Sequence, residues 1–371
     1  MSFDPKRLAH PKVLSLHPYQ PGKPIAECQR EFGLSEVIKL ASNENPLGTS
    51  RHVTHHLQKQ FNELARYPDG NGFDLKQALS RHLNISSSHF ILGNGSEDVL
   101  RMLIQTFVWG GQHIMISEYA FVAYKILAQG LGIDCREIPA KQFSVDFDTM
   151  LHAVTNETRM VIIANPNNPT GTYVNEEALQ SFLEKLPSEI LVVCDEAYYE
   201  YIVEKDYPQT LSLMARFPNL IVTRTFSKAY GLAGLRVGYG IAGEGIVELV
   251  NRIRKPFNVN HLGQVAATLA LGDQLFVQDS IALNETGKKQ LYKGFDKLGL
   301  RYIPSFANFV MVEINLPEKD IYQELLKCGV IIRPLAPYHL AHYYRITIGT
   351  EQENAKCLAA LEKVLLKENV V

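Results

Sequence analysis

The sequence lacks features that are typical of several classes of protein, and each absence reduces the range of possible functions. Its 371 residues include only five cysteines, and no two of them form a C-x-x-C pair. This excludes a disulfide framework and provides no zinc motif, so we expect reduced and mostly buried cysteines. The formal net charge at pH 7 is only −2. The chain therefore lacks the basic field that attracts nucleic acids or anionic membranes, and we expect neither as a partner.

Hydrophobic runs and common motifs are also missing. No run reaches the length of a transmembrane helix, and residues 1–10 lack the apolar core of a signal peptide, so we expect a cytoplasmic protein. His52, His55 and His56 lie close together, but no H-E-x-x-H or nearby cysteine accompanies them, and we predict no metal site. The phosphate-binding G-x-x-x-x-G-K-[ST] of ATPases is absent too. This excludes an ATPase interpretation of the acidic pair 195–196.

The chain does contain a regular alternation of apolar segments and helix-period segments from about residue 70. Apolar segments without alternating polar positions lie at 90–92, 113–116, 160–164, 190–194 and 220–223. Such segments are typical of a mostly parallel sheet covered by helices on both faces. After Gly240 the pattern changes to long helical stretches with strands near 309–314, 330–333 and 344–348. We predict an α/β protein with a large domain over residues 46–262, and a smaller α+β domain formed by residues 1–45 and 263–371.

The segment Thr225–Tyr239 is the most informative part of the chain. Lys228 follows the apolar, β-branched run 220–226, so it lies where a buried strand ends, and Arg236 returns a fixed positive charge to the same neighbourhood. The small residues between them leave room for a planar group close to the backbone. A lysine in this setting suits a Schiff base with a phosphate-bearing aldehyde. For a lone lysine, a surface loop would be the default interpretation.

Three further segments at strand ends fit the same kind of cofactor. Residues 93–98 open a helix, where backbone N–H groups can hold a phosphate, although a tight turn with Ser96 as the helix cap is an equal alternative. Two Asn-Pro steps in 165–171 make a rigid turn that directs amide side chains at one spot. Asp195 ends an apolar strand, and a buried carboxylate there would keep a pyridine nitrogen protonated. The hydroxyl of Tyr198 is near enough in sequence to reach the same ring.

Two arginines stand in apolar strands of the smaller domain. Arg333 and Arg345 each follow or interrupt β-branched residues. An arginine in such a strand needs an anionic partner, which is either internal or a bound molecule. Because two occur together opposite the cofactor segments, we predict a clamp for a substrate anion.

Together, these segments resemble the aminotransferase class I/II family of pyridoxal-phosphate enzymes, the fold-type-I group. The matching motifs are Asn-Glu-Asn-Pro at 43–46, Gly-Asn-Gly-Ser at 93–96, Asn-Pro-Asn-Asn-Pro-Thr-Gly at 165–171, Asp-Glu-Ala-Tyr at 195–198 and Ser-Lys at 227–228 with Arg236. Within the family, segments 17–19, 40–46, 66–69, 331–335 and 344–350 are most similar to the histidinol-phosphate aminotransferases. Two segments depart from the family pattern: Glu118–Phe121 stands where Pro-Thr-Tyr is frequent, and Ala336–Leu340 replaces a glycine-rich turn.

The resemblance implies pyridoxal 5'-phosphate as the cofactor and a homodimer as the assembly. Lys228 would carry the cofactor and move a proton between it and the substrate, with Asp195 at the ring nitrogen and Tyr198 at the phenolic oxygen. The other implied cofactor-binding residues are Gly95, Ser96, Glu97, Tyr119 (stacked on the ring), Asn168, Thr225, Ser227, Arg236 and, from the neighbouring subunit, Tyr67. The implied substrate-binding residues are Tyr19, Asn45, Arg333 and Arg345.

The resemblance also implies a reaction, namely ping-pong transfer of an amino group between L-histidinol phosphate and 2-oxoglutarate in histidine biosynthesis. A lyase similar to threonine-phosphate decarboxylase remains an alternative, because the sequence does not report which bond at Cα is aligned with the ring. An aromatic or broad-specificity aminotransferase is a closer alternative. A binding module without catalysis would leave Lys228, Asp195 and Arg236 without a joint role.

Overall fold

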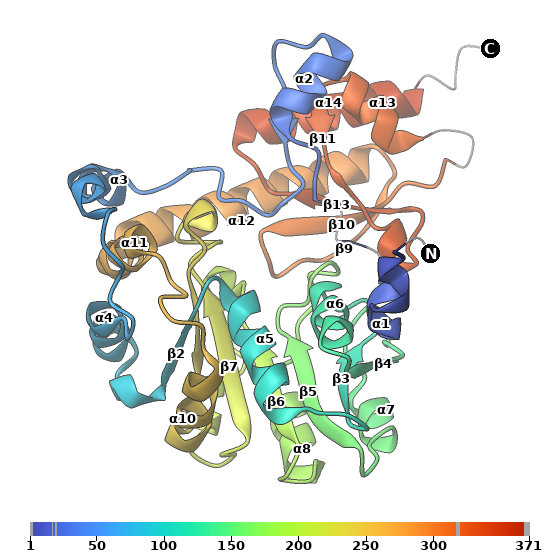
Figure 1. The fold of residues 1–371 in the computed structure, drawn as a ribbon. Coiled ribbons are helices and arrows are strands. Elements are labelled where there is room, and N and C mark those ends of the chain that lie inside the picture. The colour runs from blue at the N-terminus through green and yellow to red at the C-terminus, as the bar shows by residue number, and fades with distance from the viewer. Residues whose placement is uncertain (1–2, 17, 19–20, 317–319, 367–371) are drawn as a thin grey trace.

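The structure is a computed structural model that describes residues 3–16, 18, 21–316 and 320–366. It has a larger lower part, built on one sheet, and a smaller upper part (Figure 1). The short helix α1 (Pro11–Leu14) lies against the larger part, where Lys12 donates a hydrogen bond of 2.9 Å to the carbonyl of Gly132. In the part of the chain that the structure describes, no helix is both long and apolar enough to cross a membrane.

The larger part contains a seven-stranded sheet with the strand order β2-β8-β7-β6-β5-β3-β4. The strands are β2 (Phe90–Gly93), β3 (His113–Ser117), β4 (Asp134–Ile138), β5 (Thr158–Ala164), β6 (Leu191–Asp195), β7 (Leu220–Thr225) and β8 (Gly238–Ile241). Neighbouring strands from β4 to β7 pair in parallel, and β8 is antiparallel to both of its neighbours. The carboxyl ends of β5, β6 and β7 therefore meet at one edge of the sheet, which is the predicted α/β architecture.

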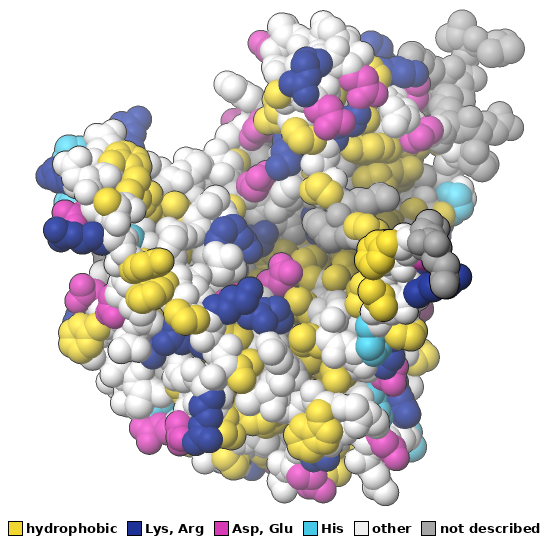
Figure 2. Space-filling view, in the orientation of Figure 1, with side chains coloured by type: hydrophobic (Ala, Val, Ile, Leu, Met, Phe, Trp, Pro, Cys, Tyr) yellow, Lys and Arg dark blue, Asp and Glu magenta, His cyan; other side chains and the backbone are white. Residues whose placement is uncertain are grey.

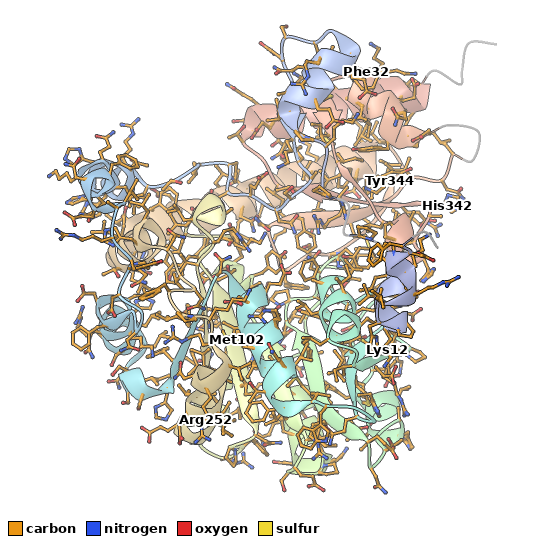
Figure 3. All side chains as sticks on the ribbon, viewed as in Figure 1. Lys12, Phe32, Met102, Arg252, His342 and Tyr344 are labelled. Atoms are coloured by element: carbon orange, nitrogen blue, oxygen red, sulfur yellow. The ribbon has the colours of Figure 1, made fainter. Side chains whose placement is uncertain are left out.

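Helices cover both faces of this sheet. They are α3 (Arg51–Leu57), α4 (Phe73–Leu83), α5 (Ser96–Phe107), α6 (Ala123–Gly130), α7 (Phe147–His152), α8 (Glu176–Lys185), α9 (Thr210–Leu213), α10 (Glu244–Ile253) and α11 (His261–Gly272). Met102 of α5, labelled in Figure 3, is buried in one apolar cluster with Ile114 and Ile116. Met115, between those two isoleucines, joins a different cluster with Phe182 of α8. Because both faces of the strands are covered, their sequences are apolar without alternation.

The smaller part has two sheets and its own helices. A four-stranded antiparallel sheet has the order β12 (Arg333–Pro334), β13 (Tyr343–Thr347), β10 (Phe309–Glu313) and β9 (Arg301–Ile303), and a two-stranded parallel sheet pairs β1 (Ile38–Lys39) with β11 (Val330–Ile331). Its helices are α2 (Ile25–Phe32), α12 (Gln274–Lys297), α13 (Ile321–Lys327) and α14 (Glu351–Leu366). The pairing of β1 with β11 joins the N-terminal segment to this part.

The long helix α12 connects the two parts. Its first turns and the preceding α11 pack with Leu75 and Leu79 of α4 in the core of the larger part, and that core continues to Val277. Further along the same helix, Leu291 and Phe295 pack in the core of the smaller part. The core of the larger part thus extends past residue 262. The predicted boundary at residue 262 falls inside α11, and the change of core comes inside α12.

Candidate active site

A cavity of about 170 Å³ lies where β5, β6 and β7 end, beneath the smaller part. The surface is hollowed between the upper and lower parts of the molecule (Figure 2). The cavity brings together many of the predicted site residues: Ser96, Glu97, Asn168, Asp195, Tyr198, Thr225, Ser227, Lys228, Arg236 and Arg345. Parallel strands end at one edge, so residues far apart in the sequence meet there.

Lys228 lies in the loop that follows β7. Its Nζ donates a hydrogen bond of 3.3 Å to the carbonyl of Ser42 and lies 5.7 Å from the centre of the Tyr198 ring. Loss of solvation and the positive charges of Arg345 and Arg236 lower the pKa of Lys228 to about 7. A substantial fraction of the amine is therefore uncharged at neutral pH, which is the form that attacks an aldehyde or accepts a proton.

Asp195, the last residue of β6, is held from two sides. The Tyr124 hydroxyl donates to its Oδ2 at 2.6 Å, and the Thr223 hydroxyl donates to its Oδ1 at 2.9 Å. Burial raises the pKa of Asp195, and the two hydroxyl donors oppose that rise. Among the residues that the structure describes, Asp195 has no salt bridge although it is buried and lines the cavity. Such a carboxylate fits the protonated ring nitrogen of pyridoxal phosphate.

The N-terminus of α5 is open to an anion. Gly95 precedes the helix with a φ of 83°, and no side chain caps the helix, so the alternative of Ser96 as a cap is wrong. A Cβ on Gly95 would lie 2.6 Å from Nη2 of Arg236. Glycine therefore lets this guanidinium lie across the helix end, where Arg236 also donates to the Ser227 hydroxyl at 3.3 Å. The positive helix end, the arginine and the hydroxyl together fit a phosphate group.

Arg345 reaches the same cavity from β13 of the smaller part. Its Nη1 donates to Oδ1 of Asn168 at 2.6 Å, and its Nη2 donates to the carbonyl of Ala41 at 2.6 Å. Asn168 belongs to the predicted Asn-Pro turn, in which both peptide bonds preceding proline are cis. A fixed guanidinium on the wall of the cavity suits a carboxylate or phosphate of a substrate.

Asn43, in the loop after β1, lines the cavity together with Asn168. Its Nδ2 donates to the Tyr198 hydroxyl at 2.9 Å. Burial raises the pKa of Tyr198 to about 12, so this hydroxyl stays protonated at neutral pH. Asn45, the predicted substrate residue, does not line the cavity, because its amide donates to the carbonyl of Ala229 and the hydroxyl of Ser280. In this loop Asn43, and not the predicted Asn45, therefore faces the cavity.

The aromatic side chains that line the first cavity also differ from the one predicted to stack on the cofactor ring. Tyr119 has a φ of 58°, and this turn directs its side chain to a second cavity. Phe121 and Tyr124 line the first cavity instead, with their rings edge to face at 5.8 Å. Neither was predicted. The spacing i, i+3 at the start of a helix was the available signal, because it places two rings on one side.

The second cavity, of about 630 Å³, lies beside the first. Ala120 and Val122 line it while Phe121, between them, lines the first cavity. Arg333 also lines it and stands opposite Arg345 in the register of β12 and β13. The two arginines therefore contact neighbouring cavities, in contrast to the single clamp predicted. Other lining residues are Ser15, Leu16 and Pro18 of the N-terminal segment and Tyr338 and His339 of the smaller part.

One predicted residue, Tyr67, lies away from both cavities. Tyr67 is 81% exposed, does not line either cavity, and stacks on Phe257 with ring centres 4.5 Å apart. Tyr19 lies outside the described residues. The described residues contain no group of three or more His, Cys, Asp and Glu side chains that could hold a metal ion.

Comparisons with known proteins agree with this geometry. Residues 35–361 match the family described as "Aminotransferase class I and II". Histidinol-phosphate aminotransferase 1 of Nitrosococcus oceani is 49% identical to this chain over 359 residues, and the match covers 97% of each chain. Histidinol-phosphate aminotransferase 2 of Pseudomonas fluorescens Pf-5 is 47% identical over 369 residues, and the match covers 99% of this chain and 100% of the relative. The crystal structure of histidinol-phosphate aminotransferase from Sinorhizobium meliloti, in complex with pyridoxal-5'-phosphate, superposes with a TM-score of 0.87 at 30% identity, covering 96% of this chain and 97% of that one. The chain therefore belongs to the aminotransferase class I and II family.

Proposed function

We propose that the protein is a pyridoxal-phosphate-dependent aminotransferase that transfers an amino group between L-histidinol phosphate and 2-oxoglutarate. Relatives with nearly half of their residues identical over almost the whole chain carry this activity in their names. The observation that carries the proposal is the cavity in which Lys228, Asp195 and an anion site meet. Each of these three elements fits a different part of one cofactor.

Each residue has a separate task in this proposal. When bound, pyridoxal phosphate withdraws electrons from the substrate Cα and so makes a proton on that carbon acidic. Lys228, with its pKa of about 7, accepts this proton and returns it. Asp195 would supply a negative charge at the ring nitrogen, and Tyr198 would donate a hydrogen bond to the phenolic oxygen. Arg236 and the N-terminus of α5 hold the cofactor phosphate.

The substrates are assigned from the two arginines and the size of the second cavity. L-histidinol phosphate has a phosphate and an imidazole ring but no α-carboxylate, so it needs room and a cation beyond the cofactor. The second cavity offers about 630 Å³ and has Arg333 in its wall. 2-Oxoglutarate and glutamate have two carboxylates, for which Arg345 and Arg333 supply one guanidinium each. Guanidinium groups bind both phosphate and carboxylate, so one pair can serve both half-reactions.

Two measurements test the proposal. The purified protein should show a visible absorption band that borohydride shifts, and Lys228→Ala should lose that behaviour. L-Histidinol phosphate with 2-oxoglutarate should give glutamate, with an aromatic amino acid as the comparison donor. Release of carbon dioxide from L-threonine phosphate without glutamate would instead identify a lyase. A wild type that remains colourless after incubation with pyridoxal phosphate would contradict the cofactor assignment.

We further propose a cytoplasmic homodimer in which Tyr67 of each subunit contacts the cofactor phosphate of the other. The support is the resemblance together with large exposed apolar side chains around this residue. Phe61 and Leu64 are more than half exposed, and Phe257, which stacks on Tyr67, is 42% exposed. Large exposed apolar side chains in one region are typical of protein interfaces.

Hybrid dimers test this arrangement. Lys228→Ala and Tyr67→Ala subunits are inactive alone if each site needs both residues. Co-expression should restore about a quarter of the wild-type activity, because half of the dimers are hybrids with one intact site of two. A mixture that stays inactive, or a monomer in solution, would contradict the shared site.

A further inference from the structure

A buried ion pair lies next to the cavity without lining it. Oε2 of Glu196 accepts a hydrogen bond of 2.9 Å from Nε of Arg224 and lies 2.8 Å from Nη2 of the same guanidinium. The Glu196 side chain is 0% exposed and the Arg224 side chain is 4% exposed. Neither residue lines either cavity, so neither contacts the cofactor or substrate directly. Because removing two charges from water is costly, the presence of this pair behind the site needs an explanation.

The pair connects the two strand ends that carry the site. Glu196 follows Asp195 at the end of β6, and Arg224 lies between Thr223 and Thr225 near the end of β7. Side chains alternate along a strand, so Thr223 and Arg224 face opposite sides of the sheet. On one side Thr223 donates to Asp195, and on the other Arg224 donates to Glu196. The backbone N–H of Glu196 also donates to the carbonyl of Thr223 at 2.8 Å.

The surroundings restrain Arg224 further. Its guanidinium carbon lies 3.5 Å from the centre of the Tyr199 ring, in the 3-10 turn Tyr199–Tyr201. Burial raises the pKa of Glu200 to about 7, and the positive charge of Arg224 opposes that rise. Among the described residues, Oε1 of Glu196 has no hydrogen-bond partner. The Glu196 carboxylate is therefore oriented by Arg224, and Arg224 is oriented by an aromatic face and this carboxylate.

We propose that the Glu196–Arg224 ion pair is a positioning element for the cofactor. It fixes the distance between Asp195, which faces the ring nitrogen, and the segment from Thr225 to Lys228, which provides the lysine and part of the phosphate site. A shift of β6 against β7 would change both ends of the cofactor site at once. The inference rests on the proposed function, because it assumes that pyridoxal phosphate occupies this cavity.

Three variants test whether the ion pair positions the cofactor or only stabilises the fold: Glu196→Gln, Arg224→Met and the double variant. Each single variant leaves one charge of the pair buried without its partner, whereas the double variant removes both charges of the pair, so its apoenzyme should unfold at a temperature closer to that of the wild type. The dissociation constant of pyridoxal phosphate is measured by titrating the apoenzyme. The circular dichroism of the bound cofactor reports how rigidly it is held. We expect all three variants to bind at least about tenfold more weakly and to lose about half of this signal, because a small misplacement is costly in a preorganised site.

Lys288→Met is the matched control. It removes another largely buried ion pair, between Lys288 and Glu285 at 2.6 Å on α12, whose residues line neither cavity. This variant should unfold at a lower temperature but bind pyridoxal phosphate with the wild-type dissociation constant and the full dichroism. The comparison shows whether loss of a buried pair weakens cofactor binding in general.

The outcomes are distinguishable. A double Glu196/Arg224 variant with wild-type binding and dichroism would show that the pair is only structural, and would overturn the inference. If the single variants do not fold, Arg224→Lys, which keeps the positive charge but loses the planar guanidinium, should bind with an affinity between those of the wild type and the double variant. Equal affinities of Arg224→Lys and the double variant would also overturn the inference. Absence of binding by the wild type would contradict the proposed function itself.

Discussion

The lowered pKa of Lys228 predicts how the stability of the apoenzyme depends on pH. We consider Lys228→Met, which removes the amine but keeps a side chain of similar length. In the folded apoenzyme, loss of solvation lowers the pKa of Lys228 to about 7, compared with 10.5 for an ordinary lysine. The apoenzyme is the correct form for this test, because a bound cofactor would occupy the amine.

The sign and size of the effect follow from proton binding. Between pH 7 and 10.5 the unfolded chain binds a proton at Lys228 more fully than the folded chain does. The free energy of unfolding therefore rises with pH in this window, by up to about 1.4 kcal/mol per pH unit. The methionine variant lacks this rise. The difference, wild type minus variant, should grow by about 2–3 kcal/mol between about pH 7.5 and about pH 9.5. This difference should not change with pH at lower pH values, where Lys228 is charged in both the folded and the unfolded chain.

Urea unfolding of both apoenzymes at several pH values measures this difference. Lys297→Met is a suitable control, because the Lys297 side chain is 75% exposed on α12 and lacks the burial that produces the slope. Its difference from the wild type should stay constant across the same range. A constant difference for Lys228→Met as well would refute the reasoning, since it would mean that the folded protein keeps this amine charged.

Three other substitutions have defined expectations. Tyr124→Phe removes a charge-assisted hydrogen bond of about 2 kcal/mol to Asp195, so kcat/KM should fall about 30-fold in steady-state assays, and an unchanged value would contradict the role of this hydroxyl. Gly95→Ala places a Cβ 2.6 Å from Arg236, so pyridoxal phosphate should bind at least about tenfold more weakly in equilibrium dialysis, and full affinity would argue against the phosphate site. Arg345→Lys loses the planar two-donor group, so the KM for 2-oxoglutarate should rise about tenfold or more, and a normal KM would remove Arg345 from the substrate site.

The first cavity was largely predictable because its polar residues directly follow apolar strands. Asp195 ends β6 and Lys228 follows β7, and parallel strands of a covered sheet end at one edge. The sequence contains both pieces of information, namely the strands without alternation and the polar residues after them. No distance was needed to infer that these side chains meet.

The residues that were missed lie on segments whose direction the sequence does not encode. Tyr124 stands in an apolar stretch and so reads as a core residue, and only its 2.6 Å contact with Asp195, 71 residues away, reveals its role. Asn43 and Asn45 belong to one irregular loop in which no periodicity tells inward from outward side chains. Asn43 has a φ of 55°, and this local turn puts its amide beside Tyr198.

Two strands of the large sheet were not predicted, for different physical reasons. β4 is one of the two edge strands and is mostly exposed, so its residues are largely polar and lack the apolar run of the central strands. β8 contains Gly238 and Gly240, which weaken the sequence pattern of a strand. These glycines are required by α5, because a Cβ on Gly238 would lie 2.2 Å from the backbone nitrogen of Ser96. The same close packing brings the N-terminus of α5 to the cavity.

The arrangement of charges around the first cavity determines the direction in which a cofactor can bind. The carboxylate of Asp195 lies at the end of β6, whereas Arg236 and the positive end of α5 form the anion site. A group with a cationic ring nitrogen and a phosphate matches this separation in one orientation only. The reverse orientation would place phosphate beside a buried carboxylate, and repulsion in a poorly solvated site is strong. In pyridoxal phosphate the aldehyde is para to the ring nitrogen and next to the carbon that carries the phosphate arm, so it would lie at the end of the ring away from Asp195, in the cavity that Lys228 also lines. The charges that would hold the ring nitrogen and the phosphate would therefore also decide which end of the ring faces Lys228.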